Sequence, residues 1–438
     1  MILLLLVART SRAETPEPAT TGCSGCVVEP APHVEPSIPE RERPTLSHRG
    51  WTIDFTGYVQ ADAVVYSQAS QDEINPSTTE PLNEEHFGIP RASLRADARR
   101  GAFAGELELE GFTTRATLPR QTQTSGVRLE TAYLSWHRQQ LVEIVGGLFR
   151  TPFGANTPTS PRERSFLELP TMFRALFPGD IDAGLMARGA FGLARWSIAA
   201  MNGAPVGDAQ WKGRDPESSY DVVARVGTDI PLPHRGRFVG GLSAVTGSAL
   251  HAGTPPTKDQ LQWIDENQDG IVQTTELTVI PGRAAEPSQP FHHDAVGLDL
   301  AAHWCLRELG HGVVQFEGAI AKNLDRGLVV ADPIARSRDV RELGFTLGVV
   351  QDLGPYAVAG VRYDRYDADR DANETQGVTT VYVHETFETW AIMAAARFTG
   401  LRLIVEYDHN TNPLGRDDTG MPTTQRADRV TLRGQVEF

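Results

Sequence analysis

Apolar and polar residues alternate with a period of two along most of the chain from residue 51 onward. The last of these runs places Val430, Leu432 and Val436 on one side and Arg433 and Gln435 on the other. Because successive side chains of a β-strand point to opposite faces, the alternation predicts strands with one apolar and one polar face. Each run has about ten residues, the length of a tilted strand that crosses a bilayer. Alternation alone also fits soluble sandwiches and barrels.

The spacing of the runs decides between these folds. We predict sixteen strands, an even number, at 51–66, 86–98, 102–113, 126–137, 140–149, 183–190, 193–202, 218–229, 236–249, 293–305, 312–323, 339–350, 354–366, 385–398, 400–410 and 427–438. Their connections alternate in length. Short ones lie at Arg99–Gly101, Arg138–Gln139, Gln351–Leu353 and Thr399, and long polar ones lie at 67–85, 114–125, 150–182, 203–217, 250–292, 324–338, 367–384 and 411–426. Short periplasmic turns and long extracellular loops are typical of outer-membrane barrels. The sequence therefore predicts an all-β fold, a transmembrane antiparallel β-barrel of about 16 strands over residues 51–438.

The beginning of the chain indicates export. Residues 1–13, MILLLLVARTSRA, have a short apolar core followed by Ser11 and Ala13 at the small-residue positions of a cleavage site. We interpret them as a signal peptide without its basic beginning, which a start codon further upstream would supply. Residues 14–50 are rich in Pro and Glu and show no periodicity, so we expect a disordered periplasmic segment. For the CxxC pair of Cys23 and Cys26 we expect a local disulfide or a chance occurrence.

Aromatic residues mark the predicted periplasmic ends of three strands. Trp51, Trp304 and Phe438 fall where outer-membrane barrels carry an aromatic girdle. Phe438 is also the last residue of an alternating strand, similar to the terminal signature by which the barrel-assembly machinery recognises its substrates. We therefore expect the bacterial outer membrane as the location, lipid around the barrel, and assembly through Phe438.

A barrel of this size encloses a lumen. Closure satisfies every backbone hydrogen bond, and sixteen strands leave an interior too wide for side chains alone to fill. The third long loop, Thr151–Asp182, would narrow this lumen if it folded inward, and Arg162, Arg164 and Arg174 would then influence charge selectivity. The alternative is an ordinary solvated surface loop.

Several segments resemble the phosphate-selective porin O/P family. They are Phe55–Gln60, Glu130–Leu134, Val145–Gly154, Ser165–Glu168 and Leu176–Ile181, and the most specific part is the Gly-x-Phe-x-x-Pro-Phe block at Gly147–Phe153. The resemblance covers most of residues 51–438 and implies a homotrimeric channel whose third loop lines the constriction. In that family, lysines and arginines along the pore carry phosphate selectivity. This chain has only Lys212, Lys258 and Lys322, so the candidates are Arg91 and Arg95 together with the three arginines of the third loop.

Residues 265–276, DENQDGIVQTTE, fit the twelve-residue calcium loop at every diagnostic position. Oxygen ligands would come from Asp265, Asn267, Asp269, the Ile271 carbonyl, Gln273 and the closing Glu276, with Gly270 at the sharp turn. Residues 257–280 are similar to a single EF-hand or dockerin-type loop, which implies a structural Ca²⁺ in the fifth extracellular loop. Thr257 and Gln260 form a capping box that predicts a short preceding helix. The alternative is an acidic turn that binds no ion.

Other function classes have weaker support. The net charge of −15 and the absence of clustered Lys and Arg argue against nucleic-acid binding. We find no nucleophile motif such as G-x-S-x-G and expect no enzyme. For His292, His293 and Asp294 a solvated strand start is a better interpretation than a metal site.

Three hypotheses follow. The first is a porin for passive diffusion of small hydrophilic solutes or ions, with anions such as phosphate among the candidates. The second is a non-conducting, calcium-stabilised surface barrel, either an adhesin or a structural protein. The third is a secreted all-β enzyme.

Overall fold

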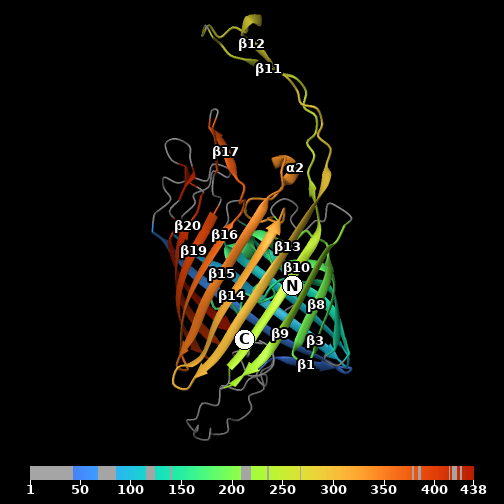
Figure 1. Ribbon diagram of the computed structural model, residues 1–438, viewed down its shortest axis with the longest axis vertical. Helices are drawn as coiled ribbons and strands as arrows, with labels where there is room; N and C mark the ends of the chain where they lie inside the picture. Colours follow the sequence, from blue (N-terminus) through green and yellow to red (C-terminus); the bar gives the residue numbers. More distant parts are fainter. Residues whose placement is uncertain are drawn as a thin grey trace, which may run out of the picture.

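The computed structural model describes residues 43–67, 85–114, 124–138, 141–208, 219–233, 236–266, 268–376, 379–382, 386–413, 415–416, 422–424 and 427–438. Within these ranges, sixteen strands form one closed antiparallel barrel (Figure 1). They are β2 (Trp51–Tyr66), β3 (His86–Arg100), β4 (Phe103–Thr114), β5 (Thr124–Arg138), β6 (Val142–Arg150), β7 (Ile181–Phe191), β8 (Ala194–Met201), β9 (Asp221–Leu232), β10 (Gly236–His251), β13 (Gln289–Leu306), β14 (Gly310–Lys322), β15 (Arg341–Leu353), β16 (Ala357–Asp367), β19 (Thr386–Phe398), β20 (Leu401–Thr411) and β23 (Arg429–Glu437). Pairing of β23 with β2 closes the ring. In the described part of the chain, no helix is long and apolar enough to cross a bilayer.

The predicted strands are confirmed, and each boundary agrees to within four residues. One predicted turn is misplaced, because Gln351–Leu353 belongs to β15 and the chain reverses after it. The reason is Gly354, whose φ of 78° supplies the left-handed conformation that the tight turn needs.

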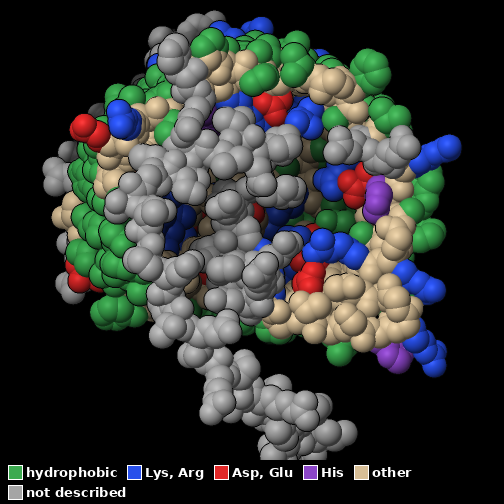
Figure 2. Space-filling view, turned by 90° about the horizontal axis from the view of Figure 1, so that it is seen from below, with side chains coloured by type: hydrophobic (Ala, Val, Ile, Leu, Met, Phe, Trp, Pro, Cys, Tyr) green, Lys and Arg blue, Asp and Glu red, His purple; other side chains and the backbone are tan. Residues whose placement is uncertain are grey.

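The two faces of the barrel differ as the alternation predicts. Val59, Leu403 and Leu432 are exposed on the outside, whereas Gln60 and Arg433 are buried inside. Figure 2 shows hydrophobic side chains around the outer rim and charged ones within the ring. An apolar exterior around a polar interior is the arrangement that a barrel in lipid requires.

Aromatic side chains gather on the outer surface. Phe316, Phe345, Tyr363 and Trp390 form a row across β14, β15, β16 and β19, with successive ring centroids 6.4, 5.8 and 4.7 Å apart. Trp51, Trp304 and Phe438 lie at strand ends on the side of the short turns. The second set fits the interfacial positions that aromatic residues favour.

The periplasmic segment extends less far than predicted. Thr45–His48 forms β1, which pairs with β2 through a turn at Arg49 and Gly50, whose φ values are 50° and 79°. The expected disorder up to Gly50 is therefore wrong at its end. Residues 1–42, which include the predicted signal peptide, Cys23 and Cys26, lie outside the described residues. Cys305, on β13, is disulfide-bonded.

The fifth long loop forms an arm that extends away from the barrel (Figure 1). Its tip is a hairpin of β11 (Gln260–Trp263) and β12 (Leu277–Ile280), followed in chain order by the barrel strand β13. The predicted helix is wrong, because Leu261 and Trp263 pair across the hairpin with Val279 and Leu277. Thr257 does not cap a helix, since its hydroxyl accepts a hydrogen bond from the Arg283 amide at 2.9 Å. Other loops carry two smaller hairpins, β17 (Asn373–Gln376) with β18 (Thr379–Tyr382), and β21 (Gly415–Arg416) with β22 (Pro422–Thr423).

Candidate functional site

The third long loop folds into the barrel. Between β6 and β7 it contains one helical turn, α1 (Thr171–Leu176), and the side chains of Phe153, Met172 and Phe173 are at most 1 % exposed. The loop is therefore not the solvated surface loop that the sequence left open as an alternative. Its inward position makes the lumen, rather than the outer surface, the candidate site.

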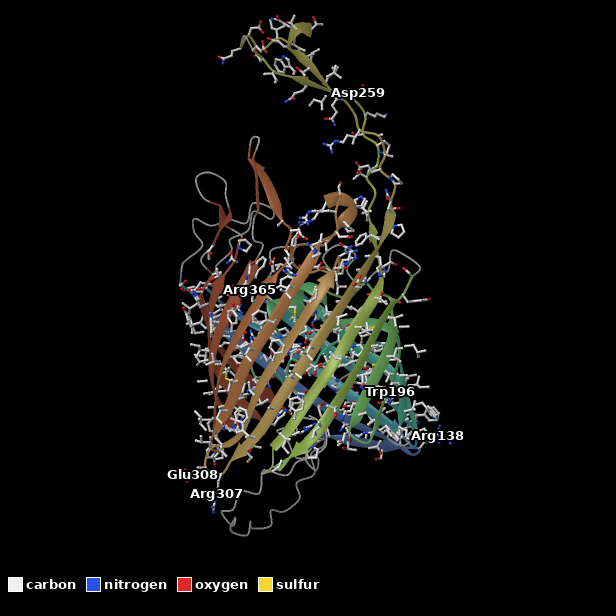
Figure 3. The ribbon with its side chains drawn as sticks, in the orientation of Figure 1. Arg138, Trp196, Asp259, Arg307, Glu308 and Arg365 are labelled. Atoms are coloured by element: carbon white, nitrogen blue, oxygen red, sulfur yellow. The ribbon has the colours of Figure 1, made fainter. Side chains whose placement is uncertain are left out.

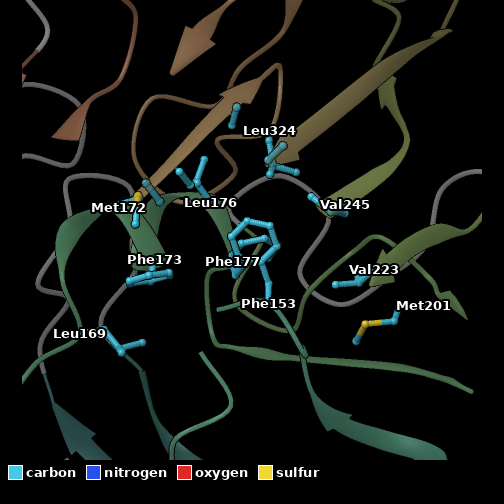
Figure 4. Packing of buried hydrophobic residues seen from close by; sticks show 14 of the residues in the cluster. Phe153, Leu169, Met172, Phe173, Leu176, Phe177, Met201, Val223, Val245 and Leu324 are labelled. Atoms are coloured by element: carbon cyan, nitrogen blue, oxygen red, sulfur yellow. The ribbon is translucent and has the colours of Figure 1, made fainter. Parts of the chain in front are cut away.

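An apolar cluster joins this loop to the inner wall (Figure 4). Phe153 packs against Phe177 with ring centroids 4.8 Å apart, and Leu324 and Leu328 of the sixth loop lie in the same cluster. The wall contributes inward side chains of eight described strands: Val145, Phe149, Met186, Ala199, Met201, Val223, Val245, Ala295, Ala319, Ala321 and Tyr366. Part of the lumen is thus filled by close-packed side chains, as in a protein core.

Gly154, the residue that follows the Gly-x-Phe-x-x-Pro-Phe block, lies where a larger side chain would not fit. A Cβ on Gly154 would lie 1.6 Å from Oε1 of Glu317 on β14, and the φ of Gly154 is +66°. Glu317 accepts hydrogen bonds from the Ala155 amide at 2.9 Å, the Asn156 amide at 3.1 Å and the Asn156 side chain at 2.6 Å. This carboxylate therefore anchors the first turn of the loop. Sequence reasoning missed Glu317, although an acidic residue at an inward position was a visible signal.

A second set of contacts holds residues 162–168 of the loop against the opposite part of the wall. Arg362 on β16 donates to the Glu168 carbonyl at 2.7 Å, and Arg402 on β20 donates to the Arg164 and Ser165 carbonyls at 2.9 and 3.1 Å. On β23, Arg433 donates to the Leu167 carbonyl, while Glu406 on β20 accepts from the Leu167 amide. These wall residues bind the backbone of the loop, so their charges are engaged in holding it.

The three loop arginines predicted for selectivity occupy different surroundings. Arg164 forms an ion pair with Asp180 at 2.5 Å and is nearly buried. Arg174 donates to the hydroxyl of Thr171 within α1. Arg162 lies 4.0 Å from Glu163, with a side chain that is about a fifth exposed. Among the described residues, Arg91 and Arg95 form their ion pairs with carboxylates of the barrel wall rather than with this loop.

Arg91 and Arg95 belong to a charged wall formed by β3, β4 and β5. Arg95 pairs with Asp97 and Glu106 at 2.8 and 2.7 Å. The neighbouring pairs are Arg91 with Glu110 at 3.5 Å, and Arg128 with Glu110 and Glu130 at 2.8 and 3.0 Å. The side chains of Arg95 and Arg128 are 35 % and 34 % exposed, whereas Glu110 and Glu130 are 2 % exposed. Guanidinium groups therefore face the lumen, with their carboxylate partners beneath them. Arg128 was missed because nothing in its local sequence distinguishes it from other arginines.

The arm contains the predicted calcium loop. Asp265 accepts hydrogen bonds from the Asp269 and Gly270 amides at 3.1 and 2.8 Å, and Gly270 has a φ of 73°. Glu276 is buried and accepts from the Trp263 indole at 3.0 Å. Carboxylate and carbonyl oxygens are the donors that calcium prefers, so the chemistry of the set fits this ion. Asn267 lies outside the described residues, and the Gln273 amide donates to Asp269 at 2.9 Å.

Metal-ligating side chains are dispersed. Among the described residues, no group of three or more His, Cys, Asp and Glu side chains is positioned to hold a metal ion. At the start of β13, His293 is buried against Asp221 at 2.8 Å, while His292 is exposed and lies 3.8 Å from Asp294. These two histidines point apart, as neighbours on a strand do, but the expected solvated position is wrong for His293, which is buried.

Comparisons with known proteins identify the fold. No protein-family model matches the chain, and no curated relative does. The outer membrane channel DcaP of Acinetobacter baumannii aligns with a TM-score of 0.54 at 12 % identity, covering 90 % of this chain and 99 % of that one. OprB of Pseudomonas putida aligns with a TM-score of 0.55 at 10 % identity, covering 88 % and 94 %. An anion-selective porin from Comamonas acidovorans aligns with a TM-score of 0.51 at 11 % identity, covering 89 % and 100 %. With its apolar exterior and closed ring of strands, the chain therefore has the fold of bacterial outer-membrane porins and belongs in the outer membrane.

Proposed function

We propose that the chain forms a channel for passive diffusion of small hydrophilic anions, with phosphate among the candidates. The observation that carries the proposal is the accessible pair Arg95 and Arg128, which face the lumen from the wall of β3 and β5. Electrostatic fields are strong in a narrow passage with low-dielectric walls, so accessible guanidinium groups there favour anions. Arginine also binds phosphate well because its planar fork offers two parallel donors. The resemblance to the phosphate-selective porin O/P family stays a prediction, as does the homotrimer that it implies.

Single-channel recording in planar bilayers under a KCl gradient tests this function. We expect stepwise conductance and a reversal potential whose sign indicates chloride preference, together with competition by inorganic phosphate. Conductance with a preference for cations would contradict the proposed anion selectivity but would still support a channel.

An alternative is a barrel that does not conduct. The apolar cluster that joins the third and sixth loops to the wall favours it, because such packing excludes water from part of the lumen. A folded, bilayer-inserted protein that never conducts would support this alternative and overturn the channel.

We also propose that the arm binds one structural Ca²⁺ through Asp265, Asn267, Asp269, the Ile271 carbonyl, Gln273 and Glu276. The carboxylates of Asp265, Asp269 and Glu276 are not gathered into a metal-holding group in the described structure, so an ion would draw them to one centre and order the tip of the arm. The Trp263 indole now holds Glu276, so calcium binding requires Glu276 to exchange this hydrogen bond for the ion. Calcium titration of the purified protein tests the proposal through the fluorescence of Trp263.

A further inference from the structure

Two histidines meet inside the barrel at the end with the short turns. His303 on β13 and His311 on β14 flank the turn that contains Arg307 and Glu308 (Figure 3). Nδ1 of His303 and Nε2 of His311 share a hydrogen bond of 3.1 Å, and the ring centroids are 5.2 Å apart. The buried residues Asp299 and Glu317 lie an even number of positions away on the same strands, so both histidines are on the lumen side.

The distance between the two nitrogens fits a shared metal ion. Zinc–nitrogen bonds are about 2.0–2.1 Å long, so two nitrogens on one ion lie about 2.9–3.4 Å apart. The hydrogen bond between the rings places a proton on one of the two facing nitrogens, so an ion binds only when it displaces that bond. Once the proton moves to the other nitrogen of its ring, each neutral imidazole directs a lone pair at the ion. His311 is exposed and His303 is half-buried, so an ion can reach both from the lumen.

Ion pairs on the neighbouring strands offset most of the positive charge around the pair. Arg237, which is aligned with His303 on β10, binds Asp229 through two hydrogen bonds of 2.6 Å. Arg397 pairs with Asp352, whose second oxygen accepts from the His311 amide at 3.2 Å. Asp229 also pairs with Arg195 at 3.2 Å, so two carboxylates offset all but one of the three guanidinium charges. Cys305 is disulfide-bonded and offers no thiolate.

We propose that His303 and His311 bind a divalent transition-metal ion, Zn²⁺, Cu²⁺ or Ni²⁺, at the periplasmic mouth of the barrel. Imidazole suits these three ions, and water completes the coordination because the described residues supply no third side chain. The site is separate from the calcium loop, which lies at the other end of the molecule on the arm (Figure 1). A bound ion would add two positive charges where solutes enter or leave.

Electron paramagnetic resonance of the detergent-purified protein with one equivalent of Cu²⁺, in saturating calcium, tests the proposal. We expect hyperfine splitting from two nitrogens in the wild type and from one in His303→Gln and in His311→Gln. Calorimetric titration with Zn²⁺ should show affinity reduced about tenfold or more by each substitution. His137→Gln is the matched control, since His137 is an exposed histidine at the same end of the barrel, on β5, and should leave both readouts unchanged.

The site would be overturned if both single variants kept the wild-type affinity for Zn²⁺. It would also be overturned if the double variant His303→Gln/His311→Gln bound Zn²⁺ as tightly as the wild type. Heat-modifiable migration on gels establishes that each variant is folded. Because the two substitutions lie on different strands, failure of one to fold leaves the other as the test.

Discussion

The ring of Phe438 lies over Gly57 where the first and last barrel strands meet. The two residues exchange backbone hydrogen bonds of 2.7 and 3.0 Å, and a Cβ on Gly57 would lie 2.5 Å from Cζ of Phe438. The aromatic end of the chain therefore packs on the seam that closes the barrel, while half of its surface stays exposed. The absence of a side chain at residue 57 allows this contact.

Filling that space should weaken the seam. Gly57→Val would displace Phe438 and crowd the Ser93 carbonyl, which lies 2.7 Å from the same Cβ position. We expect destabilisation of about 1–3 kcal/mol, seen as unfolding at lower temperature in heat-modifiable gel migration. Gly126→Val on β5 is the control, because nothing lies within 4 Å of its Cβ. Equal stability of the two variants would contradict the packing argument.

Removing the accessible guanidinium groups should change ion selectivity. With Arg95→Gln and Arg128→Gln combined, the carboxylates beneath them remain, so we expect the chloride-to-potassium permeability ratio to fall about twofold or more. The reversal potential under a KCl gradient measures this. Arg365→Gln provides the control, since Arg365 lies on the outer face of β16 near Glu388 (Figure 3). An unchanged ratio would place the selective passage elsewhere.

Releasing the first turn of the third loop should widen the channel. Glu317→Ala removes the acceptor of three hydrogen bonds and opens space beside Gly154. We expect a larger single-channel conductance with more current noise, because residues 154–156 lose their anchor. Glu317→Gln keeps one oxygen acceptor and should give an intermediate value. Glu308→Gln, at the exposed turn after β13, should match the wild type, and a wild-type conductance in Glu317→Ala would show that the loop is held by its other contacts.

Calcium should change the environment of Trp263. When Glu276 turns to an ion, the Trp263 indole loses its 3.0 Å hydrogen bond, so we expect a calcium-dependent fluorescence change that is absent in Trp263→Phe. Glu276→Gln should weaken calcium binding about tenfold or more, because this residue closes the site with two oxygens. The control is Glu266→Gln, which removes the same negative charge at a position of the loop that supplies no calcium ligand. Equal calcium affinities of these two variants would refute the assignment.

The contact between the arm and the sixth loop should depend on pH. Asp332 precedes α2 (Pro333–Arg336), caps it through the Ile334 and Ala335 amides, and lies 2.6 Å from Nδ1 of His251. Burial raises the pKa of Asp332, but these hydrogen bonds outweigh it and lower the pKa below its usual value. A lowered pKa stabilises the folded contact above about pH 4 and loses this contribution as the pH falls through the folded value.

Pepsin cleavage near α2, followed between pH 2 and pH 5, measures that contribution. We expect faster cleavage at the acid end in the wild type and a flatter profile in Asp332→Asn. Parallel profiles for the two proteins would mean that Asp332 does not carry the effect.

The alternation of side chains was sufficient to predict the sixteen strands and the faces of most of them, although it slips in the predicted strands 126–137, 183–190 and 193–202. Each strand follows a local rule, since one face meets lipid and the other the lumen, and a window of ten residues such as Arg429–Phe438 contains the whole signal. The bulge opposite Glu108 and Leu109 is an exception. There Glu130 and Thr131 are both buried, so the period slips within β5.

Sequence alone also determined the calcium motif, because its ligands lie within twelve consecutive residues. Only the tertiary structure decided which residues fill the lumen and which secondary structure forms beside the calcium motif. Glu317 meets Ala155 across 162 positions, and His303 meets His311 because two strands share a register. The segment at Gln260 has a helix-capping pattern but forms a strand, because pairing with Ile280 satisfies its backbone. Such contacts join distant parts of the chain and leave no periodic pattern, so the folded barrel, rather than any local stretch, determines them.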